Sequence, residues 1–189
     1  GGPPQDETTP LAPISPYAAS KAAQEMLALS YFRSYHLPVV VTRCYGYFNS
    51  TRLDLAPTAF AMQIARIEQG MAPNTLRRGW LGSVRTFLGI EDVLRAYWLA
   101  AGATSGVYNF GSTVPVSLAE VLTELIRLST CKDIRCVPDP ALTRPADVQQ
   151  AVPDCARFEQ ATGWRARATW KEALAELLDA CRRTVREAP

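Results

Sequence analysis

The sequence lacks the residue spacings that bind structural metal ions. Its five cysteines include no Cys-x-x-Cys pair, and His36 is the single histidine of the chain. Because a structural zinc site takes four Cys or His ligands at short, regular spacings, we expect no metal site. The odd number of cysteines and the lack of an apolar leader favour reduced thiols and therefore a cytoplasmic location.

Long apolar runs and clusters of basic residues are missing as well. No stretch approaches the ~20 apolar residues that a bilayer-spanning helix needs, so we expect no membrane contact. The arginines are scattered and the formal net charge is only +2, which predicts no nucleic-acid-binding surface. The 189 residues, 48% of them hydrophobic and 20% charged, suit one globular domain with a substantial core.

The first residues contain no opening strand. Residues 1–10, Gly-Gly-Pro-Pro-Gln-Asp-Glu-Thr-Thr-Pro, have the composition of a loop that enters the middle of a fold. The chain also contains no Gly-x-Gly-x-x-Gly turn, which binds dinucleotide phosphates after the first strand of many α/β domains. We therefore expect the sequence to be the C-terminal part of a longer protein.

Helical and β-branched segments alternate irregularly along the rest of the chain, which predicts a mixed α/β fold. Val39–Cys44 is an uninterrupted run that suits a parallel strand buried on both sides. Gly79 and Gly82 interrupt 77–88, which we interpret as a broken hairpin or strand pair. Ser117-x-x-Glu120 is a capping box. The expected helices are 16–35, 57–69, 90–101, 118–128, 154–162 and 170–186, and the other expected strands are 106–111 and 134–137.

The segment Ser15-Pro16-Tyr17-Ala18-Ala19-Ser20-Lys21 places two reactive side chains at the start of a helix. Ser15 can cap the helix, and Pro16 fits its first position, where no backbone N–H is needed. Tyr17 and Lys21 then share one helical face. A nearby cation lowers the pKa of a tyrosine, which makes the pair a candidate for proton transfer. A surface tyrosine beside a solvated lysine is the alternative that this pair leaves open.

The order of the downstream segments strengthens this interpretation. They are Val84-Arg85-Thr86-Phe87, Glu91-Asp92-Val93, Val107-Tyr108-Asn109-Phe110-Gly111, Arg144-Pro145-Ala146-Asp147 and Thr162-Gly163-Trp164. With the Tyr17/Lys21 helix, this series resembles the extended short-chain dehydrogenase/reductases that act on nucleotide sugars, in particular the GDP-6-deoxy-4-ketohexose reductases and GDP-mannose 4,6-dehydratases. The resemblance covers nearly the whole chain and implies that roughly 120 residues with the glycine turn precede it.

The resemblance implies a fold class and a division of the chain. The fold class is α/β, with the C-terminal portion of a Rossmann-type parallel sheet and a small mixed α/β substrate-binding lobe. Residues 1–56 would end the dinucleotide-binding domain and carry the Tyr-x-x-x-Lys helix. Residues 57–189 would form mainly the substrate-binding lobe, with sheet elements that return to the first domain.

The resemblance also implies a cofactor and the residues that use it. Tyr17 is the implied catalytic acid/base, and Lys21 is the residue that lowers its pKa and binds the nicotinamide ribose. Both residues would therefore contact NAD or NADP. The choice between the two cofactors depends on residues after the glycine turn, which this sequence does not contain.

Four further residues are implied to bind the substrate, a nucleotide-diphosphate sugar and in the first place a GDP-sugar. Arg85 and Arg144 are the implied phosphate clamps, because arginine binds phosphate in a bidentate manner. Asn109 and Asp147 would position neighbouring groups. For Arg144 the alternative is a surface arginine on a turn, since an aspartate shortly after a proline also fits a hydrogen-bonded turn.

Two segments depart from the pattern of these families. Where the reductases carry Phe-Asn-His after the strand arginine, this chain has Tyr45-Gly46-Tyr47, so a substrate-contacting asparagine is lost unless Asn49 takes its place. Where they carry Gly-Asn-Leu-x-x-x-Arg-Asp, this chain has Gly-Trp-Leu-Gly-Ser-Val-Arg-Thr over 79–86. Trp80 stands on the loop that would approach the nucleotide, although we interpret it as a packing residue.

These inferences predict a nucleotide-sugar-modifying oxidoreductase that reduces the 4-keto group of a GDP-6-deoxyhexose with NAD(P)H. Dehydration of GDP-mannose and epimerisation of a nucleotide sugar are alternatives of the same fold. A catalytically inactive nucleotide-sugar-binding or scaffold protein is another, and a domain without a ligand is the last. The apolar breadth of residues 19–32 is compatible with a homodimer through this helix and equally with burial in a monomer.

Overall fold

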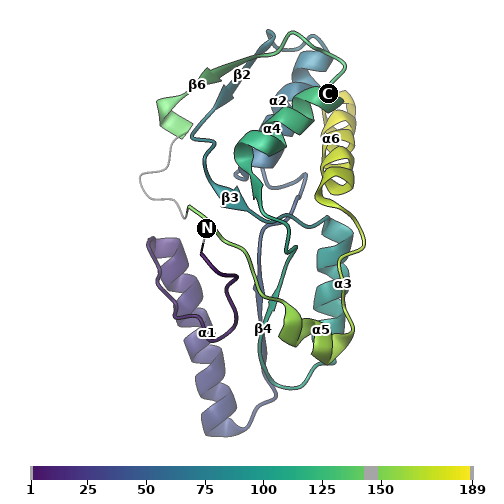
Figure 1. Ribbon diagram of the computed structural model, residues 1–189. Coiled ribbons are helices and arrows are strands. Elements are labelled where there is room, and N and C mark those ends of the chain that lie inside the picture. Colours follow the sequence, from purple (N-terminus) through teal and green to yellow (C-terminus); the bar gives the residue numbers. More distant parts are fainter. Residues whose placement is uncertain (1, 143–148, 188–189) are drawn as a thin grey trace.

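The computed structural model describes residues 2–142 and 149–187, so Arg144 and Asp147 lie outside the described residues. The described elements form two halves, one above the other in Figure 1. The helices are α1 (Pro16–Tyr35), α2 (Ala56–Glu68), α3 (Ile90–Ala100), α4 (Leu118–Leu128), α5 (Ala156–Thr162) and α6 (Trp170–Glu187), with a 3-10 turn, η1, at Pro140–Leu142. The strands are β1 (Val40–Cys44), β2 (Thr75–Arg78), β3 (Val84–Arg85), β4 (Gly106–Phe110), β5 (Val116–Ser117) and β6 (Arg135–Pro138).

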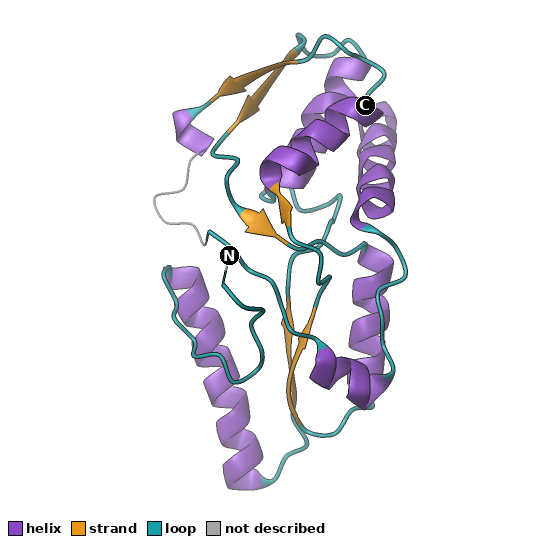
Figure 2. Cartoon of the chain, in the orientation of Figure 1, coloured by secondary structure: helices purple, strands orange, loops and turns teal. Residues whose placement is uncertain are grey.

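The parallel strands β1 and β4 are the centre of one half. They pair in register, residues 40–44 with 106–110, which confirms the predicted parallel sheet. α1 lies on one side of the pair, with α3 and α5 on the other (Figures 1 and 2). Phe110, Phe158 and Trp164 are buried under α3 and α5, with ring centroids 5.5–6.0 Å apart. Each residue of β1 is half-buried rather than buried on both sides, because among the described residues β4 is its single strand neighbour.

Helices α2, α4 and α6 enclose the core of the other half. Ile64, Leu125, Leu174 and Leu178 have no exposed surface and belong to one apolar cluster. The burial of a leucine or isoleucine side chain stabilises the fold by about 1.5–3 kcal/mol, so this cluster holds the three helices together. The parallel pair β2–β6 and the short antiparallel pair β3–β5 belong to the same half. This confirms the predicted combination of a parallel sheet with a mixed α/β lobe.

A buried ion pair also joins α2 to α6. The Arg182 guanidinium donates from Nε to Glu68 Oε2 at 2.7 Å and from Nη2 to Glu68 Oε1 at 2.8 Å. The Ser129 hydroxyl and the Thr130 backbone N–H donate to the same carboxylate, each at 2.9 Å. Burial by itself would raise the pKa of Glu68, but these donors outweigh it and lower the pKa to about 2.

Residues 77–88 do not form the predicted hairpin. β2 pairs with β6, and β3 pairs with β5, so the two strands have different partners. The partner strands β6 and β5 follow much later in the chain, and Gly79 and Gly82 do not indicate which strands will pair. Gly79 is required for a different reason, because a Cβ atom there would lie 2.3 Å from the carbonyl oxygen of Leu142.

The predicted ends of helices are confirmed where the sequence carries a local signal. Ser15 Oγ accepts a hydrogen bond from the backbone N–H of Ala18 at 3.1 Å, and α1 spans the expected residues 16–35. Ser117 and Glu120 form both bonds of the capping box before α4. Gly163 ends α5 in the left-handed conformation, with a φ of 68°.

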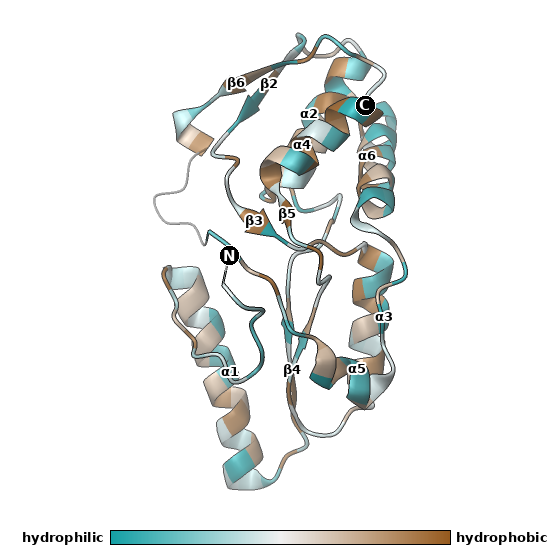
Figure 3. Ribbon diagram, viewed as in Figure 1, coloured by the Kyte–Doolittle hydropathy of each residue, from teal (hydrophilic) through white to brown (hydrophobic). Residues whose placement is uncertain are grey.

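Among the α-helices of the described residues, α1 is the one without a buried residue. Ala18, Ala22, Glu25 and Leu29 form a half-buried stripe along it. The apolar residues 19–32 are divided between this stripe and the exposed surface, where Met26, for example, is 68% exposed. Figure 3 shows brown, hydrophobic stretches along α1.

The division of the chain at residue 56 stays a prediction. Within residues 2–142 and 149–187, no helix has both the length and the apolarity to cross a membrane. The same residues contain no group of three His, Cys, Asp or Glu side chains that could hold a metal ion.

Candidate active site

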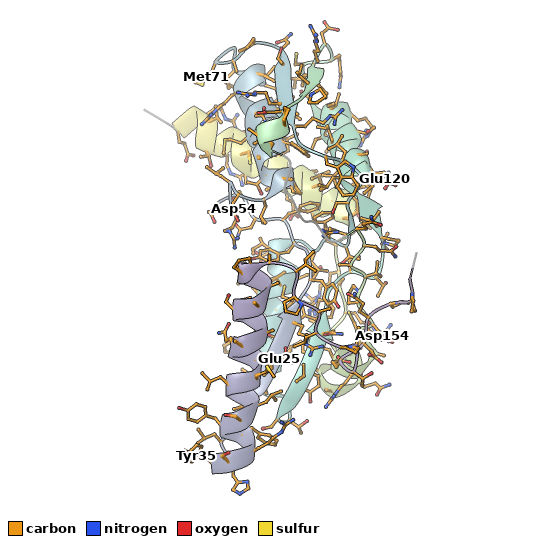
Figure 4. The ribbon with its side chains drawn as sticks, turned by 90° about the vertical axis from the view of Figure 1, so that its left-hand side faces the viewer. Glu25, Tyr35, Asp54, Met71, Glu120 and Asp154 are labelled. Carbon is orange, nitrogen blue, oxygen red and sulfur yellow. The ribbon has the colours of Figure 1, made fainter. Side chains whose placement is uncertain are left out.

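A cavity of about 1110 Å³ opens between the two halves, beside the carboxyl end of β1. Its walls come from the N-terminal loop, the start of α1, the loop that follows β1, the start of α2, and the segment from β2 to β3. Ligands of open α/β sheets bind at the carboxyl ends of the strands, so the cavity lies where a ligand is expected. Figure 4 shows Asp54, on the loop after β1, above the N-terminal end of α1.

Tyr17 lies at the edge of this cavity, whereas Lys21 does not line it. The Tyr17 side chain is 73% exposed on the first turn of α1. Lys21 is exposed one turn later, and its Nζ donates to Gln24 Oε1 at 2.5 Å. The fold therefore places the phenol at the cavity and Lys21 one helical turn further along α1, outside the lining of the cavity.

The walls of the cavity carry more positive than negative charge. Four arginines, Arg43, Arg52, Arg77 and Arg85, and two aspartates are among the lining residues. Arg85, a predicted phosphate clamp, donates from Nη1 to the carbonyl oxygen of Val84 at 2.8 Å. Arginine matches phosphate oxygens in a bidentate manner, and Arg85 is the lining arginine that the sequence predicts for this role.

Sequence reasoning missed Arg52 and Arg77, which lie on the loops around the predicted residues. Arg77 is paired with Asp139 at 2.8 Å and Arg52 with Asp54 at 2.7 Å. The Asp54 carboxylate, and more weakly Tyr17, raise the pKa of the Arg52 guanidinium above its usual value. The single sequence signal for Arg52 was its position shortly after the carboxyl end of a buried strand.

The Arg43 side chain joins β1 to α1 and so positions the helix that carries Tyr17. Its Nη2 and Nε donate to the two carboxylate oxygens of Glu25 at 2.6 and 2.9 Å, and its Nη1 donates to the carbonyl oxygen of Glu7 at 3.2 Å. The side chains of Arg43 and Glu25 are only 19% and 12% exposed. A bidentate, largely buried pair has one preferred geometry, so it sets the rotation of α1 against the sheet.

Asn109, a predicted substrate-binding residue, is fully buried and does not line the cavity. Its Nδ2 donates to the carbonyl oxygen of Gln5 at 2.9 Å, and its backbone N–H donates to Glu7 Oε1 at 2.7 Å. It therefore holds the N-terminal loop, which forms one wall of the cavity. Among the described residues, no group donates to its buried Oδ1.

The position of the missing asparagine has no room for a side chain. Gly46 lies beside residues 86–88, and a Cβ atom there would be 2.2 Å from the carbonyl oxygen of Thr86. Asn49 does not take its place, because its Oδ1 accepts bonds from the N–H and hydroxyl of Thr51 at 2.9 and 2.8 Å and it does not line the cavity.

The parallel β1–β4 pair, the Tyr17/Lys21 helix beside it and the mixed lobe across the cavity define the class of the fold: a Rossmann-type short-chain dehydrogenase/reductase. The structure of RMD from Pseudomonas aeruginosa complexed with NADPH is similar over 94% of this chain, with a TM-score of 0.86 and 29% identity. The dTDP-glucose 4,6-dehydratase of Bacillus anthracis in complex with NAD is similar over 98%, with a TM-score of 0.82 and 26% identity.

The chain belongs to the GDP-mannose 4,6 dehydratase family, whose model matches residues 1–177. It is 33% identical over 178 residues to the GDP-6-deoxy-D-mannose reductase of Pseudomonas aeruginosa, an alignment that covers 93% of this chain and 58% of that protein. It is 27% identical over 180 residues to human dTDP-D-glucose 4,6-dehydratase, covering 92% of this chain and 50% of that protein. The resemblance inferred from the ordered motifs is thereby confirmed. The chain spans about half to three fifths of the length of these relatives.

Proposed function

We propose that the protein is an NAD(P)-dependent nucleotide-sugar reductase that acts on the 4-keto group of a GDP-6-deoxyhexose. The observation that carries this proposal is that one cavity is lined by both Tyr17, a candidate acid, and Arg85, a candidate phosphate clamp. The name of one relative, GDP-6-deoxy-D-mannose reductase, agrees with this reaction.

The proposed chemistry of this chain is the transfer of one proton. Tyr17 donates its phenolic proton to the oxygen of the substrate carbonyl as that oxygen becomes an alkoxide. The positive charge of Lys21, one helical turn away, stabilises the phenolate that remains. Arg85 and Arg144 bind the diphosphate and so hold the sugar against Tyr17. Asn109 contributes indirectly, through the N-terminal loop that it holds.

The residues present fit part of a nicotinamide cofactor site. Tyr17 and Lys21 are exposed, polar and one turn apart on a helix with no buried residue, so both are accessible to a ribose and a nicotinamide ring. When bound, NADPH or NADH supplies the hydride that reduces the carbonyl carbon. The neighbour from Pseudomonas aeruginosa contains NADPH and the one from Bacillus anthracis contains NAD, so the proposal includes both cofactors.

Gly46 favours a second candidate, a nucleotide-sugar-binding protein without turnover. The family asparagine at this position cannot be accommodated, and Asn49 does not replace it. A removed polar contact typically costs about 1–3 kcal/mol, which is enough to change the substrate but not to exclude turnover. We retain the reductase because Tyr17 and Lys21 are both present. Dehydration and epimerisation use the same acid/base and remain alternatives.

Two further properties belong to the same proposal. The five cysteines are all free thiols, as is typical of a reducing compartment, which supports a cytoplasmic location. Met26, Leu27 and Tyr31 on the outside of α1 are 68%, 60% and 46% exposed. Such an apolar surface supports the proposed homodimer through this helix.

The test is to supply the whole protein that contains these residues with GDP-4-keto-6-deoxymannose and NADPH or NADH. The proposal predicts oxidation of the cofactor and a reduced GDP-sugar product, measured by absorbance and chromatography. Binding of GDP without oxidation would favour the second candidate. A folded protein that neither binds GDP nor oxidises the cofactor would overturn both.

A further inference from the structure

Trp80 lines the cavity and belongs to neither hydrophobic core of the described residues. It stands on the loop between β2 and β3, and its side chain is 48% exposed. Trp164, by contrast, is 1% exposed, and Trp170 packs against the helical core. The interpretation of Trp80 as a packing residue is therefore not supported.

The loop around Trp80 is shaped to hold the indole in this place. A Cβ atom at Gly82 would lie 2.4 Å from Cζ2 and 2.7 Å from Cε2 of the indole. The ring edge thus rests directly on the backbone of Gly82, a contact that only glycine permits. On the other side of Trp80, Gly79 lies against the carbonyl oxygen of Leu142, which fixes the start of the loop.

The neighbouring charges suit a nucleotide. Arg77 and Arg85, in the strands before and after this loop, line the same cavity as the indole. A flat aromatic surface beside two arginines is the combination that nucleotides bind, because bases stack on aromatic rings and phosphates pair with guanidinium groups. The cavity of about 1110 Å³ is large enough for such a ligand, since ligand pockets usually measure about 300–1,000 Å³.

We propose that the indole of Trp80, supported by Gly82, is the surface on which the nucleobase of the substrate stacks. This inference rests on the proposed function, because it assigns the base-binding residue of the same site. The related families carry an asparagine at this position, so the stacking contact distinguishes this chain from them. Trp80 binds the base and takes no part in the proton transfer.

The experiment measures GDP binding to the whole protein by calorimetry and by tryptophan fluorescence. Stacking contributes about 1–3 kcal/mol per base, so Trp80→Leu should weaken GDP binding about 5- to 140-fold at 1.4 kcal/mol per tenfold. Trp80→Phe should weaken it less, because a smaller aromatic ring remains. GDP should quench the emission of the wild type, and this quenching should be lost in Trp80→Leu.

Two further variants separate stacking from a general effect on the fold. Trp98→Leu is the matched control, because Trp98 is 82% exposed on α3 and does not line this cavity; binding and quenching should be unchanged. Gly82→Ala leaves Trp80 in place but displaces its ring, so it should weaken GDP binding in the wild type. In the Trp80→Leu background the same change should have no further effect.

The outcomes distinguish this inference from the proposed function. If the wild type and Trp80→Leu bind GDP with equal affinity, the stacking role is wrong and the proposed function stays in place. If Gly82→Ala weakens GDP binding equally in the wild type and in Trp80→Leu, the stacking role is also wrong. If the folded wild type binds no GDP, both the stacking role and the proposed function are wrong.

Discussion

Gly46 offers a sharp test of the structure, because an alanine there has no space. Its missing Cβ would lie 2.2 Å from the carbonyl oxygen of Thr86 and 3.4 Å from the ring of Phe87. The obstacle is backbone rather than a flexible side chain, so segments 45–48 and 86–88 must separate to accept Gly46→Ala.

The size of the effect follows from the contacts that this separation would disrupt. The backbone N–H of Leu88 donates to the Gly46 carbonyl at 3.1 Å, and that of Phe48 donates to the Leu88 carbonyl at 2.9 Å. The rings of Phe48 and Phe87 are stacked, with centroids 4.7 Å apart. Two net hydrogen bonds at about 0.5–1.5 kcal/mol each and one aromatic pair of similar worth give a loss of about 2–4 kcal/mol.

The measurement is urea unfolding of the wild type and the variant, followed by circular dichroism. Gly102→Ala is the matched control, since the nearest atom to its added Cβ is 3.8 Å away; its free energy of unfolding should stay within about 0.5 kcal/mol of the wild type. A Gly46→Ala variant as stable as this control would refute the packing of 45–48 on 86–88. It would also show that position 46 has room for the asparagine side chain of the related families.

The ion pairs Glu68/Arg182 and Glu25/Arg43 yield two further predictions. Because the folded-state pKa of Glu68, about 2, is below its ordinary value of 4.5, its stabilisation is fully present above about pH 4.5 and is lost as the pH falls toward 2. We expect the free energy of unfolding to fall by about 3 kcal/mol more in the wild type than in Glu68→Gln over this range, and parallel pH profiles would contradict the role of its pair with Arg182. Glu25→Gln should weaken the pair with Arg43 by about 1–3 kcal/mol and speed amide hydrogen exchange in α1, measured by mass spectrometry; unchanged exchange would show that other contacts set the position of α1.

Much of the fold was predictable because its signals are local. Ser15, the Ser117/Glu120 capping box and Gly163 mark helix ends within a few residues of sequence, and the structure confirms all of them. The partners of β2 and β3 were not predictable, because each pairs with a strand far along the chain. Glycines at 79 and 82 look alike in the sequence, yet one contacts backbone and the other supports an indole.

The candidate site was predictable in its parts but not in its geometry. Tyr17 and Arg85 line one cavity, and their roles as acid/base and phosphate clamp stay predictions. The burial of Asn109 and the exposure of Trp80 were not readable from composition, because both depend on contacts with distant segments. Whether a polar residue binds a ligand or holds a loop is decided by such contacts.

The proposed function depends on proton transfer from Tyr17 to a substrate bound in the same cavity. The most direct measurement is the turnover of Tyr17→Phe in the whole protein, with NADPH or NADH and GDP-4-keto-6-deoxymannose, together with its affinity for GDP. The substitution removes the acidic hydroxyl from an exposed side chain and so leaves the fold intact. We predict that kcat falls by about 10²–10⁴-fold while GDP binds as tightly as before. An unchanged kcat would contradict the role of Tyr17 as the acid.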